Sequence, residues 1–206
     1  MQQDCAQPIL PKGYSAVPDG HIAAVVTSLE MLKRPECLAQ RRFPPGFSLV
    51  SLGQPSLDRY RALYREVGED WLWYSRLVMP DDGLRAILDD PRVEFFALQD
   101  GRRDVGILEL DFREPNTCEL AFFGLAGDAI GKGVGRTLMN EAIKRAWSRP
   151  IERFWVHTCT LDHPAALGFY VRSGFTPCGF QVEVDVDPRL TGVIPRHCAP
   201  HVPLID

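Results

Sequence analysis

Three alternating glycines, Gly131, Gly133 and Gly135, stand immediately before a stretch with helical spacing of apolar residues. Glycine adopts positive φ angles and lets an anion approach the main chain without a Cβ atom in the way. At the start of a helix several backbone N–H groups lack partners, and the helix dipole adds about half a positive charge. The pattern therefore predicts a turn that binds a diphosphate group.

Two common nucleotide-binding motifs do not fit these glycines. A Walker A loop has four residues between its first glycine and the Gly-Lys pair, whereas Gly127 and Gly131 enclose three, and Gly133 follows Lys132. The dinucleotide fingerprint requires a glycine where this chain has Arg136. Neither a nucleoside triphosphate nor a dinucleotide is expected, and a tight turn without a ligand is the structural alternative.

Elements on both sides must hold this turn in place. Residues 118–125 form a short apolar and aromatic run, which is typical of a buried strand. Residues 134–147 repeat apolar side chains at helical spacing and predict a helix that ends before Pro150. A second, short helix is predicted at 164–174, with proline at its first position and glycine as its stop, and it carries Tyr170.

Together, the glycine turn and the tyrosine helix resemble the GNAT superfamily, the Gcn5-related N-acetyltransferases. Members carry a Gln/Arg-x-x-Gly-x-Gly/Ala turn, then a strand, then an Asn-x-x-Ala-x-x-Phe/Tyr-Tyr-x-x-x-Gly-Phe helix. Here the turn lies at 130–135 and the helix at 163–175, and the resemblance extends from about residue 47 to 180. It implies an α/β (α+β) protein with the GNAT fold, a central mixed, mostly antiparallel twisted sheet flanked by helices.

The resemblance also implies a function. The chain is expected to be an N-acetyltransferase that moves an acetyl group from acetyl-CoA to a primary amine of a small molecule or peptide, by direct transfer in a ternary complex. The alternative is a GNAT-fold module that binds acyl-CoA or regulates, with little catalytic activity, because two motif positions depart from the family. Ile130 replaces its Gln or Arg, and His163 replaces its Asn.

Acetyl-CoA is expected to contact three parts of the chain, again by resemblance. Backbone groups at the strand end align the pantetheine arm and polarise the thioester carbonyl. The turn holds the diphosphate, with Lys132 and Arg136 as candidate counter-charges, and His163 can still donate or accept a hydrogen bond. The expected cofactor-binding residues are Phe123, Gly124, Leu125, Gly131, Lys132, Gly133, Val134, Gly135, Arg136, His163 and Tyr170.

Acetyl transfer needs a proton acceptor, because an alkylammonium with a pKa near 10.4 is only about one part in 10³ neutral at pH 7, which costs roughly 4–5 kcal/mol. In the histone-acetyltransferase branch a base Glu lies eleven residues before the first turn position, which corresponds to Glu119. Period-2 alternation puts Glu119 on the same strand face as Ala121 and Phe123. Glu109 and Asp111 on the neighbouring strand are the alternatives, and a solvent-facing role for Glu119 is also open.

The family pattern makes Tyr170 the general acid for the departing thiolate. A phenol has a pKa near 10 and a thiol a pKa near 8.5, so proton transfer from the phenol to the thiolate is unfavourable by about 1.5 pKa units, or roughly 2 kcal/mol. Tyr170 is therefore expected to stabilise the thiolate by hydrogen bonding as much as to protonate it. A tyrosine that is only packed in the core is the structural alternative.

Substrate choice is expected to lie in the aromatic loop at 68–74, in the region where GNAT proteins border the acceptor pocket. Aromatic side chains there are candidates to line the pocket, and carboxylates to attract a cation. An aromatic cluster that merely packs the first helices on the sheet is an equally good interpretation. The candidate substrate residues are Glu69, Asp70, Trp71, Trp73 and Tyr74.

By this resemblance the chain is expected to divide into a proline-rich N-terminal extension at 1–46 that packs on the core, a GNAT acetyltransferase domain at 47–186 and a C-terminal tail at 187–206. Residues 21–32 match both a strand and a helix, and a strand is preferred. The extension could cover the acceptor cleft, add to a sheet edge or bridge a homodimer. Further strands are predicted at 47–52, 93–99, 105–112 and 153–159, helices at 56–67 and 81–88, and a final pair of strands within 175–186.

Composition excludes several classes of partner. The 206 residues carry a net charge of −4 without a basic stripe, so neither nucleic acid nor an anionic membrane is expected. No signal peptide and no membrane-spanning run is recognised, and a cytoplasmic protein is expected.

His197, Cys198 and His201 do not supply a convincing metal site. A nucleophilic pair of Cys159 and His157 is rejected, because no hydrogen-bonding acid is expected beside it.

Overall fold

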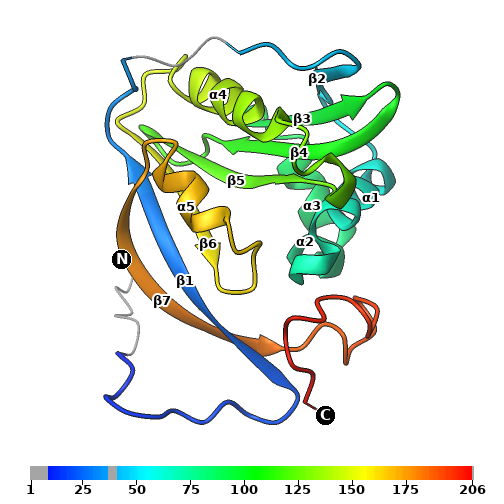
Figure 1. Ribbon diagram of the computed structural model, residues 1–206, viewed down its shortest axis with the longest axis vertical. Helices are drawn as coiled ribbons and strands as arrows, with labels where there is room; N and C mark the ends of the chain where they lie inside the picture. The colour runs from blue at the N-terminus through cyan, green and yellow to red at the C-terminus, as the bar shows by residue number, and fades with distance from the viewer. Residues whose placement is uncertain (1–8, 37–40, 206) are drawn as a thin grey trace.

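The computed structural model describes residues 9–36 and 41–205. Its strands are β1 (His21–Met31), β2 (Phe47–Ser51), β3 (Val93–Asp100), β4 (Arg103–Asp111), β5 (Thr117–Leu125), β6 (Arg153–Cys159) and β7 (Thr176–Val186). They form one sheet in the order β2-β3-β4-β5-β6-β1-β7 (Figure 1). Only the β5–β6 pair is parallel. The predicted mixed, mostly antiparallel sheet of the GNAT fold is therefore confirmed.

Helices cover both faces of this sheet (Figure 1). They are α1 (Leu57–Gly68), α2 (Ser75–Val78), α3 (Asp81–Leu88), α4 (Val134–Ala146) and α5 (Ala166–Val171), with 3-10 turns at Glu69–Trp71 and Gly127–Ala129. On one face Leu138 of α4 packs in a cluster with Leu120 of β5. On the other face Leu63 of α1 packs with Phe95 of β3. Among the described residues, no helix combines the length and apolar character needed to cross a membrane.

The N-terminal strand β1 lies inside the sheet. It pairs with β6 on one side and with β7 on the other, so the strand preferred for this segment is confirmed. Residues 21–31 therefore belong to the same sheet as the later strands (Figure 1). The predicted pair of strands within 175–186 is wrong. Thr176–Val186 is one strand of 11 residues, because it follows β1 along its whole length.

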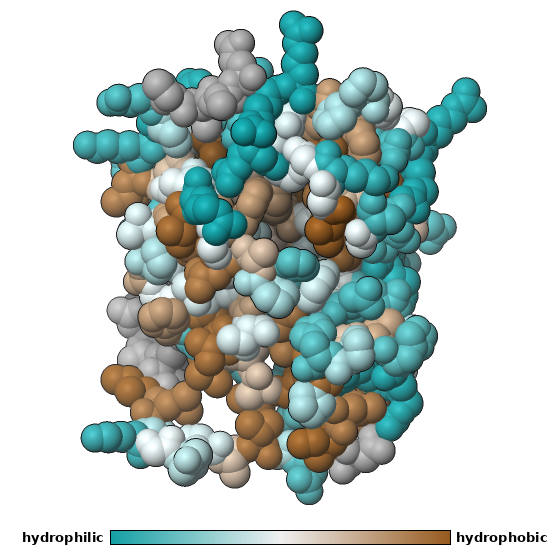
Figure 2. All heavy atoms as spheres, viewed as in Figure 1, coloured by the Kyte–Doolittle hydropathy of each residue, from teal (hydrophilic) through white to brown (hydrophobic). Residues whose placement is uncertain are grey.

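The pair of β1 and β7 leaves apolar side chains exposed on the face that carries α5. Val25 is 43% exposed, and Phe180, Val182 and Val184 of the edge strand are 73%, 45% and 47% exposed. Apolar residues gather in the lower half of Figure 2, where Figure 1 places these two strands. This part of the sheet keeps an apolar surface in contact with solvent.

Strand β5 contains a bulge in its middle. Its register against β4 shifts at Ala121, so one extra residue is inserted there. Beyond the bulge Phe123 packs in the same cluster as Leu120, whereas Phe122 packs on the opposite face of the sheet. The alternation predicted for this strand is therefore wrong past Ala121, and Glu119 shares its face with Phe122 instead of Phe123.

Strands β5 and β6 stay together for only a short distance. Their parallel pairing covers Thr117–Glu119 of β5 and residues 153–155 of β6. Beyond these residues β5 remains paired with β4, and β6 with β1. The two strands separate as they run on, so the second half of β5 has one edge that is not paired with a strand.

The C-terminal tail is ordered around the buried side chain of Arg189. The guanidinium pairs with Asp187 at 2.7 Å, and both side chains are 2% exposed. Its remaining N–H groups donate to backbone carbonyl groups of the tail, those of Cys198, Ala199, Val202 and Pro203. The tail packs on the loop before α2, where Ile194 and Leu72 belong to one buried cluster.

Candidate active site

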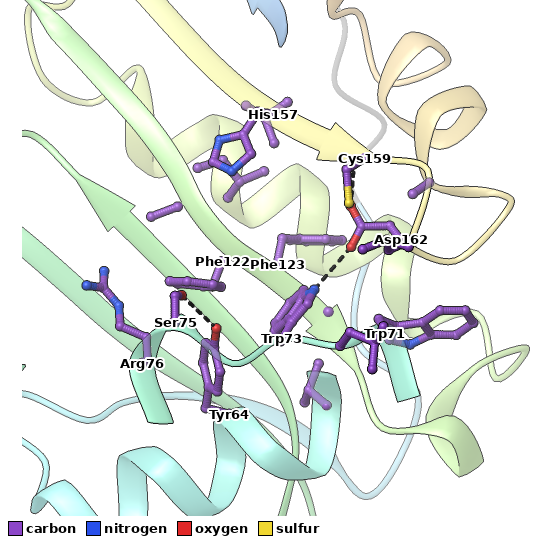
Figure 3. A pocket seen from close by; sticks show the side chains of 18 of the residues that line it. Tyr64, Trp71, Trp73, Ser75, Arg76, Phe122, Phe123, His157, Cys159 and Asp162 are labelled. Carbon is purple, nitrogen blue, oxygen red and sulfur yellow. Dashed lines mark hydrogen bonds between the residues drawn. The ribbon is translucent and has the colours of Figure 1, made fainter. Parts of the chain in front are cut away.

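A cavity of about 510 Å³ opens where β5 and β6 separate (Figure 3). Backbone and side chains of residues 120–125 form one wall, and the end of β6 and the aromatic loop 71–76 form others. The lining also includes Ile130 at the start of the glycine turn, Tyr170 of α5 and Glu183 of β7. The cavity therefore brings together residues of β1, β4, β5, β6 and β7 with the aromatic loop and α5.

The glycine turn leads directly into α4, as predicted. Gly131 and Gly133 have positive φ angles of 82° and 77°, which side chains with a Cβ rarely adopt. A Cβ on either glycine would meet no atom within 4 Å, so the backbone there is open. Gly133 caps the helix without a side-chain hydrogen bond. The first N–H groups of α4 are thus available to an anion.

The two candidate counter-charges contact neighbours beside this turn. Nζ of Lys132 lies 3.5 Å from the carboxylate of Asp100. The guanidinium of Arg136 donates to Oγ of Ser173 at 2.7 Å. Burial lowers the pKa of Arg136, and the nearby positive charge of Arg172 lowers it further. The side of the turn that faces α5 is therefore rich in positive charge.

Tyr170 lines the cavity from α5 and is 7% exposed. Its ring contacts Phe123 of β5 edge-on, with 6.3 Å between ring centroids. Burial raises the pKa of Tyr170 above its ordinary value. The hydroxyl is therefore protonated at neutral pH and is able to donate a hydrogen bond into the cavity.

His163 also lines the cavity and shapes the start of α5. Its Nδ1 accepts a hydrogen bond from the N–H of Ala165 at 3.0 Å. This turn delays the helix, which begins at Ala166 and not at Pro164 as predicted. The ring of His163 contacts the indole of Trp71, with 5.1 Å between centroids.

Glu119 and His157 lie side by side, from β5 and β6, where the two strands begin to separate. Oε1 of Glu119 lies 3.5 Å from Nδ1 of His157, and the side chains are 25% and 50% exposed. Both residues line the cavity, into which His157 points (Figure 3). The adjacent Glu119 carboxylate raises the pKa of His157, although desolvation opposes it. The expectation that no acid lies near His157 is therefore wrong.

The two alternative bases are already bound to arginines. Glu109 is 0% exposed and is not part of the cavity wall; its carboxylate accepts hydrogen bonds from Tyr60 at 2.6 Å and Arg76 at 2.8 Å. Burial raises the pKa of Glu109, while Arg76 and Tyr60 oppose that rise. Asp111 does line the cavity, but Arg113 binds its carboxylate at 2.5 Å.

All three aromatic residues of the predicted substrate loop line the cavity. Nε1 of Trp73 donates to the carboxylate of Asp162 at 3.1 Å (Figure 3). The hydroxyl of Tyr74 donates to Asp185 of β7. Trp71 and Trp73 are only partly buried, so they are not simply core residues. The loop is thus tied both to the segment before α5 and to the edge strand.

The two carboxylates predicted for substrate binding lie elsewhere. Neither Glu69 nor Asp70 belongs to the cavity wall, and Glu69 lies 3.7 Å from Arg65 of α1. Burial and then the negative charges of Glu69 and Asp70 raise the pKa of Cys198 in the tail. The tail therefore lies close to this turn, a long-range contact that the sequence does not reveal.

Several polar residues of the cavity were not predicted as site residues, among them His157, Asp162 and Glu183. Asp162 accepts hydrogen bonds from Oγ1 of Thr158 at 2.6 Å and from the N–H of Cys159 at 2.9 Å. Its position directly before the tyrosine-helix motif was the available signal. Glu183 reaches the site only because β1 and β7 extend the sheet beyond β6.

A glycine turn before a helix, a parallel strand pair that separates and a buried tyrosine beside the gap define a GNAT-type α/β protein. The chain belongs to the acetyltransferase (GNAT) family, whose profile matches residues 58–175. No match was found among curated proteins.

Solved structures show the same fold at low identity. A putative GNAT family acetyltransferase from Novosphingobium aromaticivorans is 18% identical with a TM-score of 0.55, over 84% of this chain and 69% of that chain. A Gcn5-related N-acetyltransferase from Sphaerobacter thermophilus is 15% identical with a TM-score of 0.56, over 82% and 52%.

A third similar structure is an aminoglycoside acetyltransferase from an uncultured soil metagenomic sample, 17% identical with a TM-score of 0.52, over 64% of this chain and 90% of that chain. The chain is shorter than several other matches. It spans 52% of the Sphaerobacter thermophilus protein and 64% of a functionally unknown protein from Staphylococcus epidermidis.

Proposed function

We propose that this acetyltransferase moves an acetyl group from acetyl-CoA to a primary amine of a small molecule or peptide, directly within a ternary complex. The observation that carries the proposal is the shared cavity. Ile130 beside the glycine turn, Tyr170 and Glu119 all line it. Tyr170, which can donate a hydrogen bond to a thiolate, therefore borders the same cavity as Glu119 and His157, the pair that can take up a proton.

The residues present fit acetyl-CoA. The open backbone at Gly131 and Gly133, directly before α4, offers N–H groups at a helix start to a diphosphate. The edge of β5 beyond Glu119, which is not paired with β6, offers backbone groups to a pantetheine arm. Lys132 and Arg136 add positive charge around the turn. Acetyl-CoA, when bound, supplies the acetyl thioester that the amine attacks.

Tyr170 acts on the sulfur that leaves. Between unperturbed groups, proton transfer from a phenol to a thiolate costs roughly 2 kcal/mol. Burial raises the pKa of the Tyr170 phenol, so full transfer from Tyr170 costs more than that. A buried donor nevertheless stabilises developing negative charge without reorganising. Tyr170 therefore donates a hydrogen bond to the sulfur, and solvent supplies its proton afterwards.

The acceptor side of the cavity suits a cation. Trp73 and Tyr74 present aromatic surface there, and Asp162 and Glu183 present carboxylates. Aromatic faces and carboxylates both attract ammonium groups. The two arginines of the wall are neutralised by Glu109 and Asp111, so negative charge remains in excess. We propose that these residues replace Glu69 and Asp70 in selecting a cationic amine.

A panel of amines tests this function. Butylamine, 1,4-diaminobutane, an aminoglycoside and a lysine-containing peptide are each incubated with acetyl-CoA, and the release of free coenzyme A is followed. Turnover with at least one amine supports the proposal. Calorimetry with acetyl-CoA alone runs beside it: tight binding without turnover favours a GNAT-fold binding module, for which Ile130 and His163 are the relevant departures, and no binding contradicts both.

A further inference from the structure

The proton of the acceptor amine needs a better acceptor than an ordinary carboxylate. An alkylammonium has a pKa near 10.4, and an unperturbed carboxylic acid near 4.3, so a direct transfer between them is strongly uphill. An imidazole, with an ordinary pKa near 6.5, lies much closer to neutral pH, where general bases work best. The cavity contains one imidazole that adjoins the predicted base Glu119.

Geometry favours that imidazole, the ring of His157. Its Nδ1 lies 3.5 Å from the carboxylate of Glu119, which leaves Nε2 free of that contact. Half of the His157 side chain is exposed, twice the fraction of Glu119, so an acceptor in the cavity meets the ring more readily. A carboxylate at Nδ1 also favours the tautomer that has its proton on Nδ1 and a lone pair on Nε2.

We propose that His157 accepts the proton of the acceptor amine at Nε2, and that Glu119 is a positioning residue that holds the ring through Nδ1. This inference rests on the proposed function and deepens it. Nε2 takes a proton from the bound alkylammonium, which leaves a neutral amine. As the nitrogen of this amine bonds to the acetyl carbon, it becomes acidic and releases its second proton to solvent. The bond from carbon to sulfur then breaks, and the thiolate leaves beside Tyr170. The imidazolium returns its proton to solvent through its exposed side.

The charged groups around His157 agree with this role. Glu119 on β5, Asp162 after β6 and Glu183 on β7 all raise its pKa. On its own strand the neighbours on the same face are Trp155 and Cys159, and burial raises the pKa of the Cys159 thiol to about 11, so Cys159 stays protonated. On β1 the paired residue is Ser28, which does not titrate.

Two variants and one control separate His157 from Glu119. His157→Gln and Glu119→Gln are compared with His197→Gln, which makes the same replacement at an exposed position in the tail. Turnover with an accepted amine is measured between about pH 5.5 and 9 for the three variants and the unaltered protein. The same amine is used throughout, so its ionisation affects all four proteins equally. His157→Gln is expected to lower kcat by roughly 10²–10⁴-fold, Glu119→Gln by less, and His197→Gln not at all.

The pH dependence gives the sharper test. Only neutral His157 accepts a proton, so the rate falls as pH drops through its pKa. Glu119→Gln removes the carboxylate that raises this pKa, and the acidic limb is expected to move to lower pH. Titration of the His157 ring protons by NMR should show the same shift without any substrate. In His157→Gln this limb should be absent, and added imidazole should restore part of the rate.

Three results would overturn the inference: turnover of His157→Gln within twofold of the unaltered protein, a larger loss in Glu119→Gln than in His157→Gln, or an NMR midpoint of His157 that Glu119→Gln leaves unchanged. The first two require turnover in the unaltered protein, so they contradict the role of His157 while the proposed function stands. Absence of turnover with every amine contradicts the proposed function, and the NMR titration still tests the pair.

Discussion

Tyr170 is buried and yet lines the cavity. Its hydroxyl stays protonated at neutral pH because burial raises the pKa of the phenol. Tyr170→Phe removes the hydroxyl and keeps the ring contacts with Phe123 and Phe175. We expect kcat at pH 7 to fall by roughly 10²–10⁴-fold, with little change in the calorimetric affinity for acetyl-CoA. A rate within twofold of the unaltered protein would instead assign Tyr170 to packing alone.

Glu109 illustrates a carboxylate whose role is structural. It is fully buried and binds Arg76 and Tyr60, so Glu109→Gln leaves the Arg76 cation without its counter-charge. We expect the free energy of unfolding to fall by about 3–5 kcal/mol, measured by urea denaturation. The variant should keep its pH–rate profile at temperatures where it is folded, and an altered acidic limb would count against a purely structural Glu109.

Residues whose chemistry depends on neighbours in sequence were predictable. The glycines at 131 and 133 and Tyr170 belong to local motifs, and the structure places them at a helix start and on the cavity wall. His157 was not predicted, because its partner Glu119 reaches it only through parallel pairing of β5 with β6. A pair in parallel register cannot be recognised from either strand alone.

At the scale of elements, the glycine turn depends on one backbone conformation. Gly133 has a φ of 77°, and a Cβ there costs about 1–2 kcal/mol. Gly133→Ala is expected to shift the start of α4 to relieve this strain, so that the N–H groups no longer converge. We predict an acetyl-CoA affinity about tenfold weaker, measured by calorimetry.

Gly127→Ala is the matched control for the turn. Gly127 also lies before α4, but it has no positive φ, and a Cβ there would meet no atom within 4 Å. Its affinity for acetyl-CoA should equal that of the unaltered protein. Equal losses in both variants would mean that the left-handed glycine has no special part in binding.

Element boundaries were predicted well where periodicity is local and poorly where pairing decides. Helix α3 was predicted at 81–88 and is Asp81–Leu88, because its apolar spacing matches one face. In contrast, β7 was predicted as two strands and is one, since β1 supports it over its full length. The bulge at Ala121 could not be recognised from the sequence, because the residues on both sides of it are apolar.

At the scale of the whole molecule, the C-terminal tail supports the aromatic loop of the cavity. The ring of His201 contacts Trp71 with 5.4 Å between centroids, and its Nε2 lies 3.4 Å from the carbonyl oxygen of Leu161. The same indole also contacts the ring of His163, with 5.1 Å between centroids. The tail therefore connects the loop that borders the acceptor with the segment that leads into α5.

Arg189 holds this tail, so its replacement tests the connection. Arg189→Met leaves Asp187 buried without its counter-charge and frees four backbone carbonyl groups. We expect the free energy of unfolding to fall by about 3–5 kcal/mol. A loosened tail should also release Trp71, which raises KM for the amine several-fold while the affinity for acetyl-CoA changes little, because the glycine turn lies in another part of the chain.

Arg102→Met, at an exposed position in the turn between β3 and β4, is the control and should change neither quantity. An unchanged KM in folded Arg189→Met would show that the tail stabilises the fold without shaping the acceptor site.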